Sequence, residues 1–225
     1  MMKAGGAFII LGILLVSLVF HTPVTRLGSG FLVGDGRQLV TYHDLVKGAR
    51  ILKVKFPNQD DIEAELIFSD PASNLAILEL REEVKTKAIP LVLNSRGLGS
   101  QNEPVFTIGY PWTNTMEDQH VLIEGLTFVD TASVLVKLNM ILDPVHSGSP
   151  LFNSKQEVVG MVLLGTHARA HFPVDGSHNF VIPALLVEKV LKSSEIGESG
   201  QRVEDLSRQE FILKSKDNIV LVEAS

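Results

Sequence analysis

The feature that most constrains the fold of this chain is a long series of short β-like runs. From Gly28 onward, these runs alternate with Gly, Pro, Asn and Asp residues, which are typical of turns. In residues 52–56, three apolar side chains alternate with two lysines, which is the two-residue period of a strand with one buried face. Many strands at this spacing predict an all-β fold, either an antiparallel barrel or a sandwich.

A charged, turn-rich segment divides the predicted strands into two groups. It spans residues 81–104 and is charged in its first part and rich in Gly, Ser and Asn in its second part. Such a composition is typical of a crossing between two lobes. With 225 residues, of which 45% are hydrophobic, the chain can build a core in each lobe, so we expect two barrels.

The pattern changes after the last predicted strand. Apolar residues in ALLVEKVLKSS, directly after Pro183, have the spacing of a short amphipathic helix over about 183–193. A polar, net acidic stretch follows, and then two apolar runs around SKDN, which predict a linker and a C-terminal β-hairpin in 193–225. We therefore divide the chain into residues 1–26, 27–192 and 193–225.

The first of these parts contains an uninterrupted apolar run, AFIILGILLVSLVF, at residues 7–20. Its 14 residues are fewer than the ~20 of a spanning helix, but 5–24 approaches that length if its ends lie among the lipid headgroups. A cleaved signal peptide is the alternative, although the pairs of residues near its end are poor cleavage sites. We expect an uncleaved transmembrane anchor, with Lys3 on the cytoplasmic side and the globular part on the extracytoplasmic side, periplasmic or lumenal.

The overall charge and composition disfavour several functional classes. A formal net charge of −6 and the absence of a basic patch with interleaved aromatic residues argue against nucleic-acid binding. The chain has no cysteine, which excludes disulfides, thiol nucleophiles and Cys-ligated zinc.

The histidines do not predict a metal site. His167 and His171 flank ARA and, with His146 and His178, form a loose group, but a metal site needs three or four converging ligands. This pattern is more typical of solvated loop histidines, so we expect neither a metal ion nor a cofactor.

One loop has the composition of a nucleophile loop. In DPVHSGSPLFN, residues 143–153, Ser147 is followed by Gly, a small residue, Pro and an apolar pair, and the loop lies between two β-like runs. A serine hydroxyl is a weak nucleophile at neutral pH, and it needs a base within hydrogen-bonding distance that is itself held by a third group. The rest of the chain decides whether Ser147 has these partners.

Five motifs together resemble the trypsin-like serine proteases of the HtrA type, to which DegP and DegS belong. They are GSGFLVGDGRQLVTYHDLVKGA, DPASNLAIL, TIGYPW, DPVHSGSPLFNSKQEVVGMV and NFVIPALLVEKV, in the order and spacing of that family over about residues 27–192. The resemblance implies a double antiparallel β-barrel with the active site in the cleft between the barrels. The PDZ domains that commonly follow in the family do not fit into the residues after Lys192.

The same resemblance assigns positions to individual residues. Ser147 occupies the position of the nucleophile, and Val145 that of a glycine whose backbone N–H helps to line the oxyanion hole. The base motif matches residues 41–49 without a gap and puts Asp44 at the histidine position. The third motif puts Asn74 at the position of the acid.

These replacements impair catalysis for separate reasons. An ordinary aspartate has a pKa of ~3.9, far too low for a base at neutral pH, so Asp44 is a poor base. Asn74 has no negative charge to stabilise an imidazolium, and the β-branched Val145 resists backbone angles that glycine accepts. We therefore interpret the chain as a pseudoprotease. The alternative is a one-residue slip that makes His43 the base of an active enzyme.

Three functions remain open from the sequence. The preferred one is a membrane-anchored, catalytically silent trypsin-like domain that binds another protein, as a scaffold, accessory subunit or regulator of a membrane complex. The second is an HtrA-like serine endopeptidase that uses Ser147 with His43. The third is a module that binds peptides in the cleft without cutting them. The partner and the oligomeric state stay open.

Overall fold

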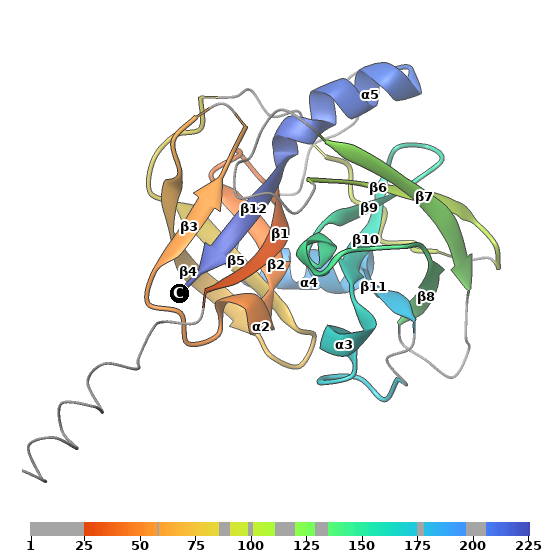
Figure 1. Ribbon diagram of the computed structural model, residues 1–225, viewed down its shortest axis with the longest axis horizontal. Coiled ribbons are helices and arrows are strands. Elements are labelled where there is room, and N and C mark those ends of the chain that lie inside the picture. Colours follow the sequence, from red (N-terminus) through yellow and green to blue (C-terminus); the bar gives the residue numbers. More distant parts are fainter. Residues whose placement is uncertain are drawn as a thin grey trace, which may run out of the picture.

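Twelve strands of the described residues close into two antiparallel barrels, shown in Figure 1. The computed structural model describes residues 25–57, 59–85, 91–98, 101–110, 120–128, 135–174, 178–196 and 206–225. The first barrel has the order β1 (Arg26–Val33), β12 (Ile219–Ala224), β3 (Leu52–Lys55), β4 (Ile62–Asp70), β5 (Leu75–Leu80), β2 (Gln38–Tyr42). The second has the order β10 (Val158–Leu163), β11 (Asn179–Pro183), β8 (Val136–Asn139), β7 (Val121–Phe128), β6 (Pro104–Gly109), β9 (Pro150–Asn153). The predicted double barrel is confirmed.

The strands that line the cores have the sequences expected for burial. All but one residue of β5 are buried, and β10 is buried throughout, which agrees with their nearly continuous apolar sequences LAILEL and VVGMVL. One cluster of buried side chains includes residues of both barrels, and a smaller one lies within the second barrel. The two barrels are therefore packed against each other through apolar contacts.

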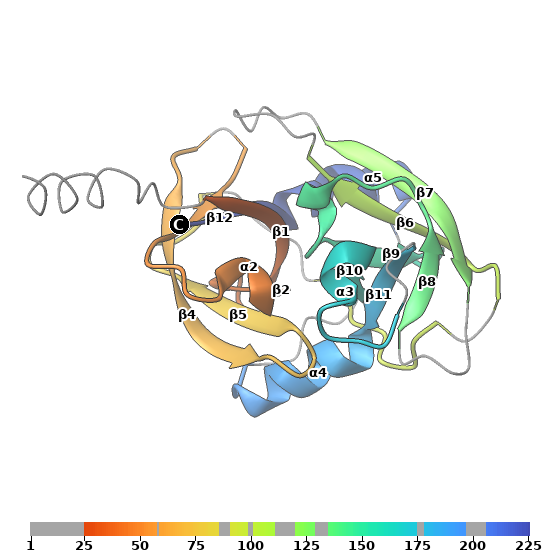
Figure 2. The ribbon, with the colours of Figure 1, turned by 60° about the horizontal axis from the view of Figure 1, so that its bottom comes forward.

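The predicted C-terminal helix is present, and it joins the two barrels. Helix α4 (Ala184–Ser193) follows Pro183 directly and buries Ala184, Val187, Val190 and Leu191. It contacts β10 and β11 of the second barrel and β5 of the first. Figure 2 shows α4 running along both barrels.

The predicted C-terminal hairpin is wrong. Residues 208–215 form helix α5 (Arg208–Ser215), because the side chains of Ser207 and Glu210 form a capping box that starts a helix. After the short 3₁₀ helix η2 (Lys216–Asn218), β12 pairs with both β1 and β3. The predicted boundary at residue 192 therefore separates the first barrel from its sixth strand.

The C-terminal segment, residues 206–225, which we call the tail, contacts the second barrel before it enters the first. Phe211 of α5 packs edge-on against Phe106 and Phe152, with ring centroids at 6.3 and 5.2 Å. Arg208 lies over the ring of Phe106, and the Tyr110 hydroxyl donates a hydrogen bond to the carbonyl of Lys216. The tail thus bridges the two barrels on the side where Figure 1 shows α5.

The predicted membrane anchor at residues 7–20 lies outside the described residues. Among the residues that the structure does describe, no helix combines the length and the apolar character needed to cross a bilayer.

Candidate active-site cleft

Ser147 lies at the junction of the two barrels, in a loop that the first barrel holds. It follows the 3₁₀ helix η1 (Pro144–His146) and precedes β9. The backbone N–H of Ser29 in β1 donates to the carbonyl of Ser147 at 2.8 Å, and the Ser29 hydroxyl donates to the carbonyl of Val145 at 2.6 Å. The backbone around Ser147 is therefore held by contacts from across the cleft.

Gly148 makes this close approach possible. Its φ is +97°, which side chains rarely allow, and a Cβ there would lie 1.9 Å from the carbonyl oxygen of Ser29. The glycine of the S-G pair is thus required by backbone geometry, whether or not the serine reacts.

The hydroxyl of Ser147 is bonded to a histidine that the sequence did not assign to it. Ser147 Oγ and His167 Nδ1 are 2.8 Å apart, and the backbone N–H of Leu164 donates to the same oxygen at 3.0 Å. Burial lowers the pKa of His167, which favours a neutral ring whose Nδ1 can accept the hydroxyl proton. Ser147 itself has an exposed fraction of 0%.

The segment 164–172, which carries His167, fills the space beside Ser147. Directly after β10, the chain turns into helix α3 (Gly165–Ala168). The amides of His167 and Ala168 both donate to the carbonyl of Leu164, so these backbone groups form hydrogen bonds within the segment itself. The ring of His167 stacks on Tyr42 of the first barrel at 5.1 Å between centroids. We call residues 164–172 the cleft-filling segment.

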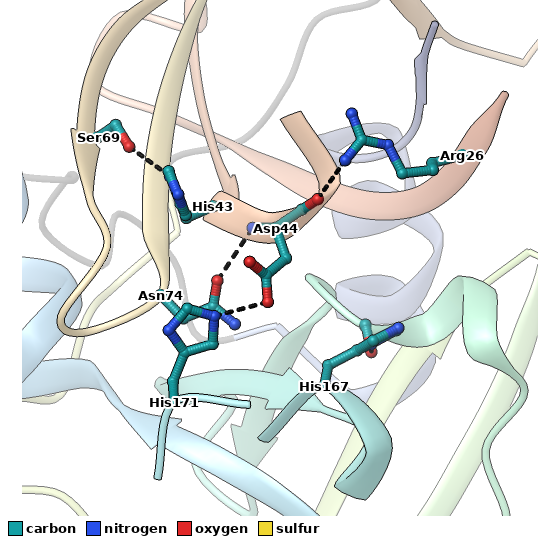
Figure 3. A network of polar contacts seen from close by, with 8 residues as sticks. Arg26, His43, Asp44, Ser69, Asn74, His167 and His171 are labelled. Atoms are coloured by element: carbon teal, nitrogen blue, oxygen red, sulfur yellow. Dashed lines mark hydrogen bonds and ion pairs between the residues drawn. The ribbon is translucent and has the colours of Figure 1, made fainter. Parts of the chain in front are cut away.

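Asp44, at the position of the catalytic histidine, is bonded to a second histidine of this segment. Its Oδ2 lies 2.6 Å from Nε2 of His171, and its backbone N–H donates to Oδ1 of Asn74 at 3.0 Å (Figure 3). The Arg26 guanidinium donates to the carbonyl of Asp44 at 2.8 Å. The prediction that His167 and His171 are solvated loop residues is wrong, because tertiary contacts bring both into the cleft.

His43, the alternative base, points toward the first barrel. It begins helix α2 (His43–Val46), and its Nδ1 lies 2.6 Å from the hydroxyl of Ser69 in β4. Figure 3 shows its ring directed to Ser69, on the far side of Asp44 from His167. Burial lowers the pKa of His43. In this arrangement the partner of Ser147 is His167, and His43 is engaged elsewhere.

Asn74, at the position of the acid, has a structural role in this geometry. It is fully buried, and its φ of +52° is in the left-handed region, which asparagine tolerates better than most residues. Its side-chain oxygen accepts from the amide of Asp44, and its carbonyl accepts from the amide of His43 at 3.1 Å. Asn74 therefore organises the start of α2 and has no hydrogen bond to an imidazole there.

The loop of residues 143–147, which we call the oxyanion loop, does not offer two free backbone amides to a substrate oxygen. The N–H of Ser147 donates to the carbonyl of Pro144 at 3.2 Å, and that of His146 donates to Asp143 at 2.9 Å, as the 3₁₀ turn requires. Val145 is 3% exposed, within the apolar core. An oxyanion hole needs amides that point at the reacting oxygen, and here the amide of Ser147 is already used within the loop.

The described residues contain no group of three or more His, Cys, Asp and Glu side chains arranged to hold a metal ion.

Comparison with known proteins identifies the family. Residues 28–161, more than half of the chain, match the trypsin-like peptidase domain family. The chain belongs to this family of trypsin-like peptidase domains.

Several relatives are described as probable periplasmic serine endoproteases of the DegP type. A probable periplasmic serine endoprotease DegP-like protein of Pseudomonas putida is 30% identical over 139 residues, which are 60% of this chain and 28% of that protein. A protein of the same description from Rickettsia prowazekii is 25% identical over 202 residues, 81% of this chain and 37% of its own. The chain thus spans between a quarter and two fifths of the length of these relatives.

A solved structure has the same fold. The serine endoprotease from Yersinia pestis matches with a TM-score of 0.58 and 23% identity, over 74% of this chain and 57% of that chain. The resemblance to HtrA-type proteases noted from the five motifs is thereby confirmed.

Proposed function

We propose that this protein is a membrane-tethered trypsin-like pseudoprotease that binds another protein, as a scaffold, accessory subunit or regulator of a membrane complex. The observation that carries the proposal is the state of Ser147. Its hydroxyl is fully buried under the cleft-filling segment and is bonded to His167 and to the amide of Leu164. A peptide carbonyl cannot approach this oxygen while residues 164–172 stay in place.

The hydrogen bond between Ser147 and His167 does not by itself supply a catalytic pair. In a working triad a carboxylate orients the second nitrogen of the base, whereas the carboxylate of Asp44 is bonded to His171. In the oxyanion loop, the amide of Ser147 also donates its hydrogen bond to the carbonyl of Pro144, within the same turn. These contacts support a Ser147 hydroxyl with a structural role, held by hydrogen bonds, more than one activated for nucleophilic attack.

The same segment argues against peptide binding in the cleft. A peptide bound as an added strand needs free backbone groups along an extended edge. After β10 the chain becomes helical, and the amides of His167, Ala168 and Arg169 donate to carbonyls of the same segment. We infer that the partner binds to another surface of the protein.

The extracytoplasmic location rests on two observations. The DegP-like relatives of Pseudomonas putida and Rickettsia prowazekii are described as periplasmic, and residues 7–20 are apolar without interruption. A tether at the amino terminus would hold the double barrel close to the membrane on that side.

Phosphonate labelling separates the pseudoprotease from an enzyme. We expect the full-length protein to show no labelling of Ser147 and no hydrolysis of casein, with the Ser147→Ala variant as the matched control. Purification from detergent-solubilised membranes should recover a protein partner in a fixed ratio. Hydrolysis by the wild type that disappears in the Ser147→Ala variant would overturn the proposal and show that the cleft-filling segment can open.

A further inference from the structure

The first half of β1 has different neighbours on its two edges. On one edge, the strand pairs with β12 from Arg26 to Phe31. On the other edge, pairing with β2 begins only at Phe31. Before that point, a contact with the cleft takes the place of a strand partner, because the backbone N–H of Ser29 donates to the carbonyl of Ser147 at 2.8 Å. This half of β1 therefore connects the beginning of the described chain to the cleft.

The backbone of β1 also packs directly on residues that support the cleft-filling segment. A Cβ at Gly28 would lie 2.8 Å from Cε1 of Tyr42 and 2.9 Å from Cδ2 of Leu45, so only a glycine leaves room for this approach. Tyr42 in turn stacks on His167, the histidine that is bonded to the hydroxyl of Ser147. A shift of β1 at this point cannot leave these neighbours in place.

Arg26, at the start of β1, holds the end of helix α2. Its Nη1 donates to the carbonyl of Asp44 at 2.8 Å, and its Nη2 donates to the carbonyl of Lys47 at 2.7 Å. The last carbonyls of a helix have no donor within the helix, and a forked guanidinium can satisfy two of them at once. Leu45 and Val46 bury the apolar side of α2, and Arg26 binds its polar side.

Asp44 is the point at which these contacts reach the cleft. Its N–H donates to the side chain of Asn74, its carbonyl accepts from Arg26, and its carboxylate lies 2.6 Å from Nε2 of His171, as Figure 3 shows. A helix of one turn is not stable by itself, so the position of this carboxylate depends on tertiary contacts. Arg26 therefore helps to place Asp44 where it meets the cleft-filling segment.

We propose that Arg26 controls access to Ser147. Its two hydrogen bonds keep α2 in the position in which Asp44 binds His171, and that contact keeps residues 164–172 over the serine. When Arg26 is released, α2 shifts, the contact with His171 is lost and the segment moves away from the hydroxyl. Arg26 is the second residue that the structure describes, so a displacement of the chain at the start of β1 opens the cleft. This control does not depend on a membrane tether or on the identity of a partner.

A buried thiol reports on this opening. The sequence has no cysteine, so a Ser147→Cys variant of the full-length protein carries a single thiol, at a position with an exposed fraction of 0%. A maleimide reaches this thiol only when the cleft-filling segment moves or the protein unfolds. The control is Ser215→Cys at the end of α5, which is equally buried and has no contact with the cleft-filling segment among the described hydrogen bonds.

We expect Arg26→Ala to raise the labelling rate at position 147 about tenfold and to change the rate at position 215 little. Hydrogen bonds from a charged donor typically change an equilibrium by about tenfold or more. Arg26→Lys keeps the charge but loses the fork, and should give an intermediate rate. Arg81→Ala removes an arginine that forms two ion pairs elsewhere on the first barrel, and should leave the rate at position 147 unchanged.

Two results would overturn the proposal. One is an unchanged rate at position 147 in Arg26→Ala, and the other is an equal rise at both positions, which would show a general loss of stability. If Arg26→Ala does not fold, Arg26→Lys provides the same comparison. Hydrogen exchange gives a second measurement without a cysteine: the peptide that contains the amide of Leu164, which donates to Ser147 Oγ, should exchange faster in Arg26→Lys, whereas peptides from β12 should not.

Discussion

The two barrels contribute different kinds of residues to the cleft. The second barrel supplies Ser147 and both histidines that contact the site, His167 and His171. The first barrel supplies Asp44, Asn74 and His43, whose hydrogen bonds mainly organise the start of α2 and the contact with β4.

This division changes what the cleft can do. The family resemblance puts the nucleophile position, Ser147, on the second barrel and the base position, Asp44, on the first. Here the serine and its histidine are 20 residues apart on the same barrel. The contacts between barrels, Ser29 to Ser147 and Asp44 to His171, join the two walls of the cleft. The difference teaches that the polar groups of the cleft are bonded to one another across the two barrels.

The largest effect is expected from a charge in the strand that closes the first barrel. Val222 of β12 is fully buried between β1 and β3, so Val222→Asp should prevent folding or lower the unfolding free energy by more than about 4 kcal/mol. Circular dichroism during urea unfolding measures this. The control Glu223→Gln, at the next position and half-buried, should cost less than about 1 kcal/mol. Similar losses for both variants would show that β12 does not close the barrel.

The second effect concerns the backbone contact between the barrels. Gly148→Ala should destabilise the protein by about 2–4 kcal/mol, because the new Cβ meets the carbonyl of Ser29 and φ is positive. Gly36→Ala is matched in φ, at +90°, but has nothing within 4 Å, and should cost only about 1 kcal/mol. Equal costs at the two glycines, measured by urea denaturation, would contradict a close contact at Ser29.

The third effect concerns the polar bridge across the cleft. A double-mutant cycle of Asp44→Asn and His171→Ala should give a coupling free energy of about 1–2 kcal/mol, because the pair is mostly buried and 2.6 Å apart. Lys192 and Glu188 on α4, where the lysine side chain is 57% exposed, serve as a control cycle with an expected coupling below about 0.5 kcal/mol. A coupling at Asp44 no larger than that of the control would mean that the cleft is not joined in solution.

The smallest effect is a dependence on pH. Burial lowers the pKa of His167, so the unfolded chain binds a proton at this residue more readily than the folded protein does. Stability therefore falls as pH decreases through the ordinary histidine pKa of ~6.5. His43 and His146 have lowered pKa values too and contribute in the same direction. His167→Gln should therefore show a smaller loss of unfolding free energy between about pH 7.5 and about pH 5.5 than the wild type. An unchanged slope would argue against a buried neutral His167.

Much of the fold could be predicted from the sequence because its signals are local. Alternating strands, turn residues and the run after Pro183 are short-range patterns, and they predicted both barrels and α4. Ser207 and Glu210, three residues apart, are also a local helix-start signal, and the hairpin prediction made no use of it.

The contacts of the cleft could not be predicted in the same way. Asp44 and His171 are separated by 127 residues, and no periodicity links them. His167 gave only a spacing pattern, since a histidine in a loop has the same sequence context whether it faces water or a buried serine. Burial of Ser147 under residues 164–172 depends on how the chain turns after β10.

The sequence by itself determined which chemical groups are available: a serine in a tight glycine loop, an aspartate and an asparagine at the helper positions, and no cysteine. Only the tertiary structure decided how these groups are used. It placed β12 in the first barrel and two histidines of the second barrel against Ser147 and Asp44. The physical reason is that side-chain chemistry is local, whereas burial and hydrogen-bond partners depend on the packing of segments far apart in the chain.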